Sequence, residues 1–540
     1  MNRARQRGAI GLSATLLMLS VVLLAAVSID SARLYLAKRT LQAQADLAAL
    51  AMSRSSCYID GVNNEEELKA EALSNLAANG FEGTATIDFA TAYISNKHWK
   101  LKESAVDRSA GKVLLIETVP ASLLAGGVFG EDIRLSASAT VLKRLNVGYS
   151  MGSGLVDVDL TNSLLSALLG GSVSLLSYEG LLNARINLGE LLAALDETGT
   201  GFNTDLSLGN LTELLETEVS VGDLLDAMIS VLGSDASASA AVTLLQQLRL
   251  TGNSDALDVT LANLLSIVDE TSIPDDVLGR SLLATNLNAY DLLTSVLMSA
   301  NQDSVLTLNG LSLSVAGVSN LGVTLKVIQA PQYVVGYFPS DEGAEPVLKT
   351  AQLQLGISGS LSLSSLGLPV SLANFTLAVS IANAEAKLLD VQGCTLKEGM
   401  DLTFQVSPST AGVQVNASIL GLLGTSVATV SGNVPVASSS PVTKVISVQD
   451  ADLPYGPERV NSSASSTLSG TIESLNLSVS LLGLTLSTAQ GQSVKSLFAD
   501  TLETLGSALI EPLLLGLGVS IGYADITILS ADVEKGDLIQ

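Results

Sequence analysis

Residues 9–29 form an unbroken run of uncharged, mostly apolar residues close to the N-terminus. A helix of this length rises about 30 Å, which matches the hydrocarbon core of a lipid bilayer. The basic residues Arg3, Arg5 and Arg7 precede the run, and Asp30 follows it. Because basic residues flank a membrane span on its cytoplasmic side, the sequence predicts a cytoplasmic N-terminus and a chain that lies across the membrane after Asp30.

The competing interpretation of this run is a cleaved signal peptide. Ala26-Val27-Ser28 resembles a cleavage site, but the apolar region of a signal peptide is typically about 7–15 residues long. Residues 31–54 contain neither Gly nor Pro and are rich in strong helix formers. Apolar residues at helical spacing give this segment one apolar face: Leu34, Leu41, Ala45, Ala48 and Met52. We therefore expect a retained transmembrane helix that continues as a helical stem over residues 30–58.

The segment from Arg5 to Ala51 resembles the N-terminus of TadE/TadG-like proteins, which assemble Flp pili. The shared pattern is a basic start ending in Gly8, an apolar span, and polar residues at fixed offsets beyond it: Asp30, Arg33, Tyr35 and the run Gln42-Ala43-Gln44-Ala45-Asp46. Two later stretches, 147–181 and 327–339, are similar to TadG-related proteins. The resemblance implies a single-pass protein of the bacterial inner membrane, with the bulk of the chain in the periplasm. It also implies other pilus-assembly proteins as partners and leaves homo-oligomers open.

One position departs from the pattern of the pilins themselves. Pilins are cut after a Gly and carry a Glu five residues later. If Gly8 were that Gly, the fifth residue would be Ser13, and residues 9–29 contain no acidic residue. The resemblance therefore favours an assembly component over a fibre subunit.

Beyond the stem, residues 59–146 have the pattern of a small membrane-proximal α+β domain. Asn63 and Asn64 are candidate caps for a helix that runs to about Asn79, where Gly80 provides the stop. Strand patterns follow at 84–94, 112–119 and 133–142.

Residues 147–305 are Leu-rich and mainly helical in pattern. A motif recurs at 186–195, 219–228 and 259–268, each copy an extended piece followed by an amphipathic helix. Repeats of this length can stack as a solenoid. The simpler alternative, which we favour, is a helical subdomain whose segments share a local pattern.

Residues 306–540 change to the alternating pattern of strands, for example at 311–315, 353–357 and 475–479. A helix over 493–515 and a strand over 519–529 follow. Strands with one apolar face pack against helices or enclose a cavity, so a hydrophobic-ligand (lipid) binding module on a membrane anchor is the alternative function.

The net charge of −26 argues against nucleic-acid binding, because an acidic surface repels phosphates. The two cysteines, Cys57 and Cys394, form no CxxC pair, which excludes a zinc site of the usual structural kind. In an oxidising compartment they are candidates for one disulfide, and the alternative is two buried thiols.

The chain offers few residues for catalysis or metal binding. Its one histidine, His98, has the context of an exposed turn between strands. Ser150 lies in a GxSxG pattern, but residues 153–159 open no obvious helix and no histidine follows the serine. The pairs Asp157/Asp159 and Asp450/Asp452 would each put two carboxylates on one side of a strand, with too few further ligands for Ca²⁺. Asp30 and Arg33, one helical turn apart, are placed to pair or to anchor the helix at the interface.

We predict no enzyme, no catalytic residue, no metal and no cofactor. The fold class is α+β, with an N-terminal transmembrane helix, an extended stem, a small α+β domain, and a large ectodomain of Leu-rich helices and antiparallel sheet. The predicted segments are a basic cytoplasmic start (1–8), the transmembrane helix (9–29), the helical stem (30–58), the membrane-proximal α+β domain (59–146), the Leu-rich helical region (147–305) and the mainly β region (306–540). The predicted function is a structural component of a Tad (Flp) pilus or secretion apparatus that acts by protein contacts.

Overall fold

A computed structural model of the chain shows a mixed α+β protein with one long apolar helix at the N-terminus. The structure describes residues 9–54, 59, 64–95, 98–102, 109–122, 132–151, 158–170, 172, 179–197, 216–251, 254–267, 285–308, 317–338, 347–363, 372–393, 396–420, 426–436, 440–449, 453–461, 471–472, 475–481, 488–533 and 536–539. The chain divides into two compact units: residues 1–145 with 533–540 (unit 1), and residues 146–532 (unit 2).

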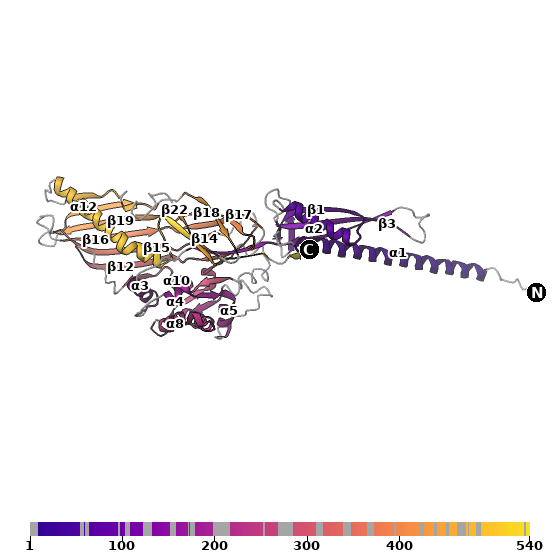
Figure 1. Cartoon of the computed structure of the whole chain (residues 1–540), viewed down its shortest axis with the longest axis horizontal. Coiled ribbons are helices and arrows are strands. Elements are labelled where there is room, and N and C mark those ends of the chain that lie inside the picture. Colours follow the sequence, from indigo (N-terminus) through magenta and orange to yellow (C-terminus); the bar gives the residue numbers. More distant parts are fainter. Residues whose placement is uncertain are drawn as a thin grey trace, which may run out of the picture. The chain divides into compact units, whose positions relative to one another are not determined.

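Unit 1 is built on a single helix, α1 (Ala9–Met52), which crosses the predicted boundary between span and stem without a break. Its N-terminal half extends alone beyond the strands of the unit (Figure 1). The large apolar side chains described between Leu16 and Ile29 are between 54% and 73% exposed. Farther along, the predicted apolar stripe is confirmed for Leu41, Ala45, Ala48 and Met52, which are fully buried, whereas Leu34 is half-buried. One half of α1 is therefore bare, and the other half is part of a folded core.

The core of unit 1 forms between α1, a second helix and a five-stranded antiparallel sheet ordered β2-β1-β3-β4-β25. These elements are α2 (Glu65–Ala78), β1 (Thr84–Ser95), β2 (His98–Lys102), β3 (Ala110–Pro120), β4 (Asp132–Leu142) and β25 (Asp537–Ile539). The predicted helix and three strands are confirmed to within a few residues. Gly80 has a φ of +68°, as a glycine stop requires. Asn64 stands at the N-cap of α2, but its side chain makes no capping hydrogen bond.

The C-terminal tail joins unit 1, although the sequence pattern groups it with the region 306–540. In the structure, β25 pairs antiparallel with β4, Ile539 opposite Thr140 and Asp537 opposite Leu142. Ile539 is buried in a small cluster with Ala110 and Leu142. A short tail strand carries no pattern that could reveal a partner strand roughly 400 residues away.

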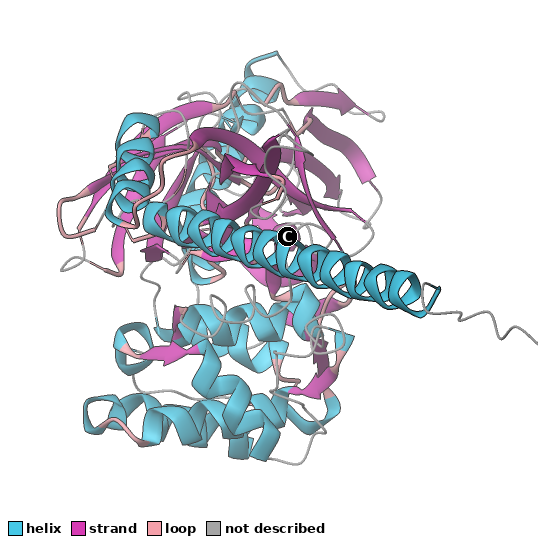
Figure 2. Ribbon diagram, turned by 90° about the vertical axis from the view of Figure 1, so that its right-hand side faces the viewer, coloured by secondary structure: helices cyan, strands magenta, loops and turns pink. Residues whose placement is uncertain are grey.

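Unit 2 combines a group of helices with three larger sheets (Figure 2). The antiparallel seven-stranded sheet has the order β11-β12-β15-β16-β19-β20-β23, the five-stranded sheet the order β22-β24-β5-β13-β9, and the four-stranded sheet the order β14-β17-β18-β21. The strands are β5 (Leu145–Met151), β9 (Leu265–Ile267), β11 (Val305–Leu308), β12 (Val318–Gln329), β13 (Tyr333–Phe338), β14 (Val347–Lys349), β15 (Gln352–Ser362), β16 (Leu372–Ile381), β17 (Glu385–Gln392), β18 (Met400–Ser407), β19 (Ala411–Leu420), β20 (Ser426–Val434), β21 (Val442–Val448), β22 (Tyr455–Asn461), β23 (Ser478–Leu481) and β24 (Tyr523–Val533).

The predicted alternation of residues 353–357 is confirmed, because Leu353, Leu355 and Ile357 of β15 are buried. The segment 311–315 lies outside the described residues, and only the end of 475–479 is strand. The predicted C-terminal helix is α12 (Thr488–Leu505), which continues through a π-helical turn (Gly506–Ile510) into α13 (Glu511–Gly516). In Figure 1 α12 crosses the view in front of the seven-stranded sheet, and its residues Val494, Phe498 and Leu502 belong to the same core as that sheet.

The Leu-rich region contains α3 (Val158–Leu168), α4 (Glu179–Asn183), α5 (Leu188–Glu197), α7 (Val221–Gly233), α8 (Ser239–Thr251) and α10 (Ala289–Ala300), with short 3₁₀ turns at Ala236–Ala238, Ser254–Ala256 and Leu261–Asn263. One continuous core joins these helices to the seven-stranded sheet and to α12 and α13. Both parts of the ectodomain thus share one core within unit 2.

The recurring motif is a three-residue strand followed by a helix or turn. The strands are β6 (Arg185–Asn187), β7 (Glu218–Ser220), β8 (Asp258–Thr260) and a fourth that was not among the predicted copies, β10 (Asn286–Asn288). In each strand the first residue is exposed, the central aliphatic residue is buried, and the third residue is half-buried. The first strand pairs with the fourth and the second with the third, so the copies do not stack as a solenoid.

The third copy is an exception to the predicted strand-and-helix pattern. After β8 the chain forms a 3₁₀ turn, and the next residues become β9, which pairs in parallel with β13. The backbone N–H of Tyr333 donates to the carbonyl of Leu264 at 2.9 Å. The helix predicted within 259–268 is therefore wrong, because strand pairing takes the backbone groups that a helix would use.

The motif makes a testable prediction about helix capping. The Asn288 side chain accepts hydrogen bonds from the backbone N–H groups of Tyr290 (2.9 Å) and Asp291 (3.2 Å), and donates to the carbonyl of Leu182 (2.6 Å). Asn288→Ala is expected to lower the free energy of unfolding by about 1–2 kcal/mol. The matched control is Thr260→Ala, since Thr260 has the equivalent position but makes no capping bond. Hydrogen exchange of α10 measures the effect, and equal protection in both variants would contradict it.

Candidate functional site

The first candidate site is the place where the bare half of α1 meets the folded part of unit 1. Asp30 and Arg33, the two interface residues predicted from the sequence, both contact the end of the β3–β4 hairpin. The Ser122 hydroxyl donates to the Asp30 carboxylate, and the Arg33 guanidinium donates to the backbone carbonyl of Pro120. The residues just after the apolar run are thus tied directly to the end of the hairpin.

The same helix covers the open edge of β4. Strand β25 pairs with residues 140–142, and no strand among the described residues pairs with the preceding part of that edge. There the Lys38 ammonium donates to the carbonyl of Ser136, and the Gln42 amide donates to the carbonyl of Ser138 at 2.9 Å. Gln42 also binds Asp46 at 2.9 Å. These polar residues of the stem therefore hydrogen-bond backbone carbonyls at a strand edge. Left unpaired, such an edge is a site where a strand of another chain can pair.

The stem packs on the sheet at very short range. A Cβ at Gly111 of β3 would lie 2.9 Å from Cε of Met52, so a glycine there leaves room for the end of α1. The contacts from Asp30 to Met52 run along most of the hairpin. The second half of α1 is thus packed against the sheet along most of the length of the hairpin.

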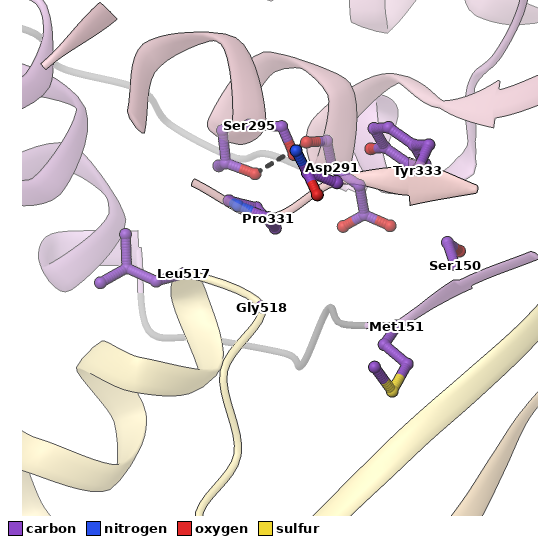
Figure 3. Close-up of a pocket in the computed structure, with 10 residues that line it drawn as sticks. Ser150, Met151, Asp291, Ser295, Pro331, Tyr333, Leu517 and Gly518 are labelled. Carbon is purple, nitrogen blue, oxygen red and sulfur yellow. Dashed lines mark hydrogen bonds between the residues drawn. The ribbon is translucent and has the colours of Figure 1, made fainter. Parts of the chain in front are cut away.

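The second candidate site surrounds Ser150 of β5 (Figure 3). Ser150 is 8% exposed and lies beside a cavity of about 20 Å³. The lining residues come from β5, α10, β13 and the loops before β13 and after α13: Ser150, Met151, Asp291, Thr294, Ser295, Pro331, Gln332, Tyr333, Leu517 and Gly518. A space of this size has room for about one water molecule and none for an acyl chain.

The described lining of this cavity does not supply the base of a serine hydrolase. It contains no histidine or lysine that could accept the Ser150 proton, and Asp291 is the one carboxylate among these residues. The next helix among the described residues, α3, begins at Val158. The geometry around Ser150 is that of a buried polar group.

Tyr333 is the most perturbed group at the cavity. Its hydroxyl is buried, and Ser295 of α10 lies close to it. Burial raises its pKa well above the usual value, and the nearby carboxylate of Asp291 raises it further by repelling a phenolate. No motif in the sequence marks Tyr333 as a candidate. Asp291 belongs to an Asp-Leu-Leu sequence that α10 shares with α7.

The raised pKa of Tyr333 predicts a loss of stability in alkali. The unfolded tyrosine ionises near its ordinary pKa of about 10, whereas the folded one stays protonated. Stability is therefore fully present below pH 10 and falls as the pH rises from there toward the folded pKa. In Tyr333→Phe this loss is expected to be smaller. Thermal unfolding between pH 9 and pH 11 measures it, and identical pH profiles of wild type and variant would contradict it.

The remaining predicted residues fall into two groups. The residues that lie outside the described part of the chain are Arg3, Arg5, Arg7, Cys57, Cys394, Asp157, Asp450 and Asp452. His98 is the first residue of β2 and pairs with Ser95 in the β1–β2 hairpin, close to the predicted turn. Asp159 lies in α3, so its predicted strand position is wrong.

The outward face of the seven-stranded sheet is polar but almost uncharged. Its neighbouring residues form rows across the strands, such as Ser358–Thr376–Asn416–Ser431 and Ser360–Asn374–Ser418–Thr429. The Ser360 hydroxyl donates to the Asn374 side chain at 2.8 Å within one row. On a chain with a net charge of −26, this face offers a broad surface without electrostatic repulsion.

Comparison with known proteins identified one similarity. A family model described as a domain of unknown function (DUF8293) matches residues 157–298. The match runs from the start of α3 into α10 and contains all four copies of the short strand motif. Neither the curated proteins nor the solved structures gave a match.

Proposed function

We propose that this chain is a membrane-anchored structural component of a Tad (Flp) type pilus or secretion apparatus. The observation that carries the proposal is the division of α1 into a bare apolar half and a half built into the core of unit 1. Such a helix transmits the position of the membrane directly to a folded domain. The resemblance of residues 5–51 to TadE/TadG-like proteins is the reason for proposing the Tad (Flp) apparatus as its setting.

The bare half of α1 acts as a retained span, with the N-terminus cytoplasmic and the rest of the chain in the periplasm. A helix with this apolar exposure is either removed as a signal sequence or buried in lipid. Two features favour the anchor: the length of the apolar run, and the bonds that join Asp30 and Arg33 to the hairpin. These bonds give the residues that directly follow the apolar run a structural role in unit 1.

The role is that of an assembly component that works through protein contacts. Ser13 stands where a pilin of this kind would carry Glu, and α1 uses its second half to complete its own domain. Unit 2 supplies the uncharged outward face of the seven-stranded sheet as contact surface. The residues described around Ser150 include no histidine or lysine that could serve as a base for hydrolysis.

Photo-crosslinking in intact cells tests the proposal. A photoreactive amino acid is placed at Asn416, which is exposed on the outward sheet face, or at Leu250 of α8, which is 85% exposed. We expect at least one position to crosslink to another protein of the pilus apparatus. The control is the same residue at Phe404, which is fully buried. Crosslinks only to unrelated periplasmic proteins would contradict the proposal.

A further inference from the structure

The contacts between α1 and the β3–β4 hairpin fix how far along the helix each hairpin residue lies. Ser122 binds Asp30, and Pro120 is bound by Arg33. Farther from the N-terminus, Lys38 and Gln42 bind the next part of β4. These bonds set the register of hairpin and helix, so the height of the hairpin above a membrane spanned by α1 follows from the helix itself.

That height places the end of the hairpin at the lipid headgroups. Asp30 is the first charged residue after the apolar run, and Arg33 lies three residues later, about 4.5 Å farther along the axis. The headgroup layer adds about 5–7 Å on each side of the hydrocarbon core. Ser122 therefore lies at the inner boundary of this layer, and Pro120 lies within it.

The residues at this level suit such an environment. Pro120, Ala121 and Ser122 are uncharged. Across the hairpin Asp132 pairs with Pro120, and the next residue, Ile133, pairs with Val119 and is a large apolar residue that is 37% exposed. On α1, Tyr35 is 66% exposed at a level where aromatic rings commonly lie in the interface of a membrane. The exposed side chains of Ile133 and Tyr35 would therefore be stabilised by contact with lipid in the interfacial layer.

We propose that the hairpin end, formed by Pro120, Ala121, Ser122 and Ile133, contacts phospholipid headgroups in the leaflet where α1 leaves the bilayer. This inference rests on the proposed anchor role of α1. A single helix leaves a domain free to tilt and to turn about the helix axis. A second contact beside the helix restricts both motions, so the hairpin end sets the orientation of unit 1 on the membrane.

Depth-dependent fluorescence quenching tests this contact. An environment-sensitive fluorescent amino acid is introduced at Ala121 or Ile133 in the full chain, which is then reconstituted into phosphatidylethanolamine–phosphatidylglycerol vesicles. Leu23 is the reference inside the span, and Leu538 of β25, which is 39% exposed at the opposite end of the sheet, is the aqueous reference. Spin-labelled lipids with shallow or deep labels act as quenchers.

We expect shallow labels to quench Ala121 and Ile133 several-fold more than Leu538, and deep labels to quench Leu23. Ser122→Ala in the Ala121 probe protein should reduce the shallow quenching and leave Leu23 unchanged. If both hairpin probes behave like Leu538 while Leu23 is quenched, the hairpin contact is overturned and the anchor stands. If Leu23 is not quenched either, the proposed anchor and the hairpin contact both fail.

Discussion

Replacing residues 1–28 with an unrelated cleavable signal peptide is expected to move the protein from carbonate-washed membranes to the soluble periplasmic fraction. The replaced segment carries most of the apolar run, in which residues 9–29 contain eleven Leu, Ile and Val residues. At about 0.3–0.6 kcal/mol each, these residues favour insertion by roughly 3–7 kcal/mol. No other described helix is long and apolar enough to replace them.

The full-length chain is the matched control for this experiment, since both forms are exported and differ only in the anchor. If residues 9–29 were a cleaved signal, both proteins would be soluble and would have the same mature mass. Mass spectrometry of the membrane-bound form should show an intact N-terminal segment. A soluble wild-type protein that begins near Ile29 would contradict the retained anchor.

The second large effect is expected in the core of unit 2. Tyr290 of α10 is 1% exposed, and its hydroxyl donates to the carbonyl of Gly516 in α13 at 3.0 Å. Tyr290→Ala leaves a cavity the size of an aromatic side chain and is expected to lower the free energy of unfolding by about 3–5 kcal/mol. Tyr290→Phe removes only the hydrogen bond and should cost about 1–2 kcal/mol.

Denaturant unfolding of the full chain, followed by hydrogen exchange in α10 and α13, separates these two variants. Because Tyr290 joins the helical region to the C-terminal helix, Tyr290→Ala should lower protection in both segments. A loss confined to α10, or equal losses for Ala and Phe, would show that the contact with Gly516 does not join the two regions as described.

Local patterns were sufficient to predict much of the fold. The unbroken helix, the buried face of the stem, the strands of unit 1 and the alternation of β15 all depend on neighbouring residues, which a sequence displays directly. The fourth copy of the short motif was missed because Asn288-Ala289-Tyr290 differs from the other copies. The Asp-Leu-Leu that begins at Asp291 was the available signal.

The features that could not be predicted depend on partners far apart in the chain. Three such features join distant segments. They are the pairing of β25 with β4, the pairing of β9 with β13, and the hydrogen bonds from Asp30 and Arg33 to the hairpin end. Side-chain periodicity says which face of an element is buried, but it does not say what covers that face. For the same reason, the surroundings of Ser150 could be found only in three dimensions.

Electron microscopy of surface pili in an in-frame deletion strain tests the central claim most directly. We expect the deletion to abolish pili, and we expect wild type and Ser150→Ala to restore them equally. Normal piliation in the deletion strain would contradict a role in assembly. Failure of Ser150→Ala to restore pili, with the protein present at normal levels, would contradict a purely structural role.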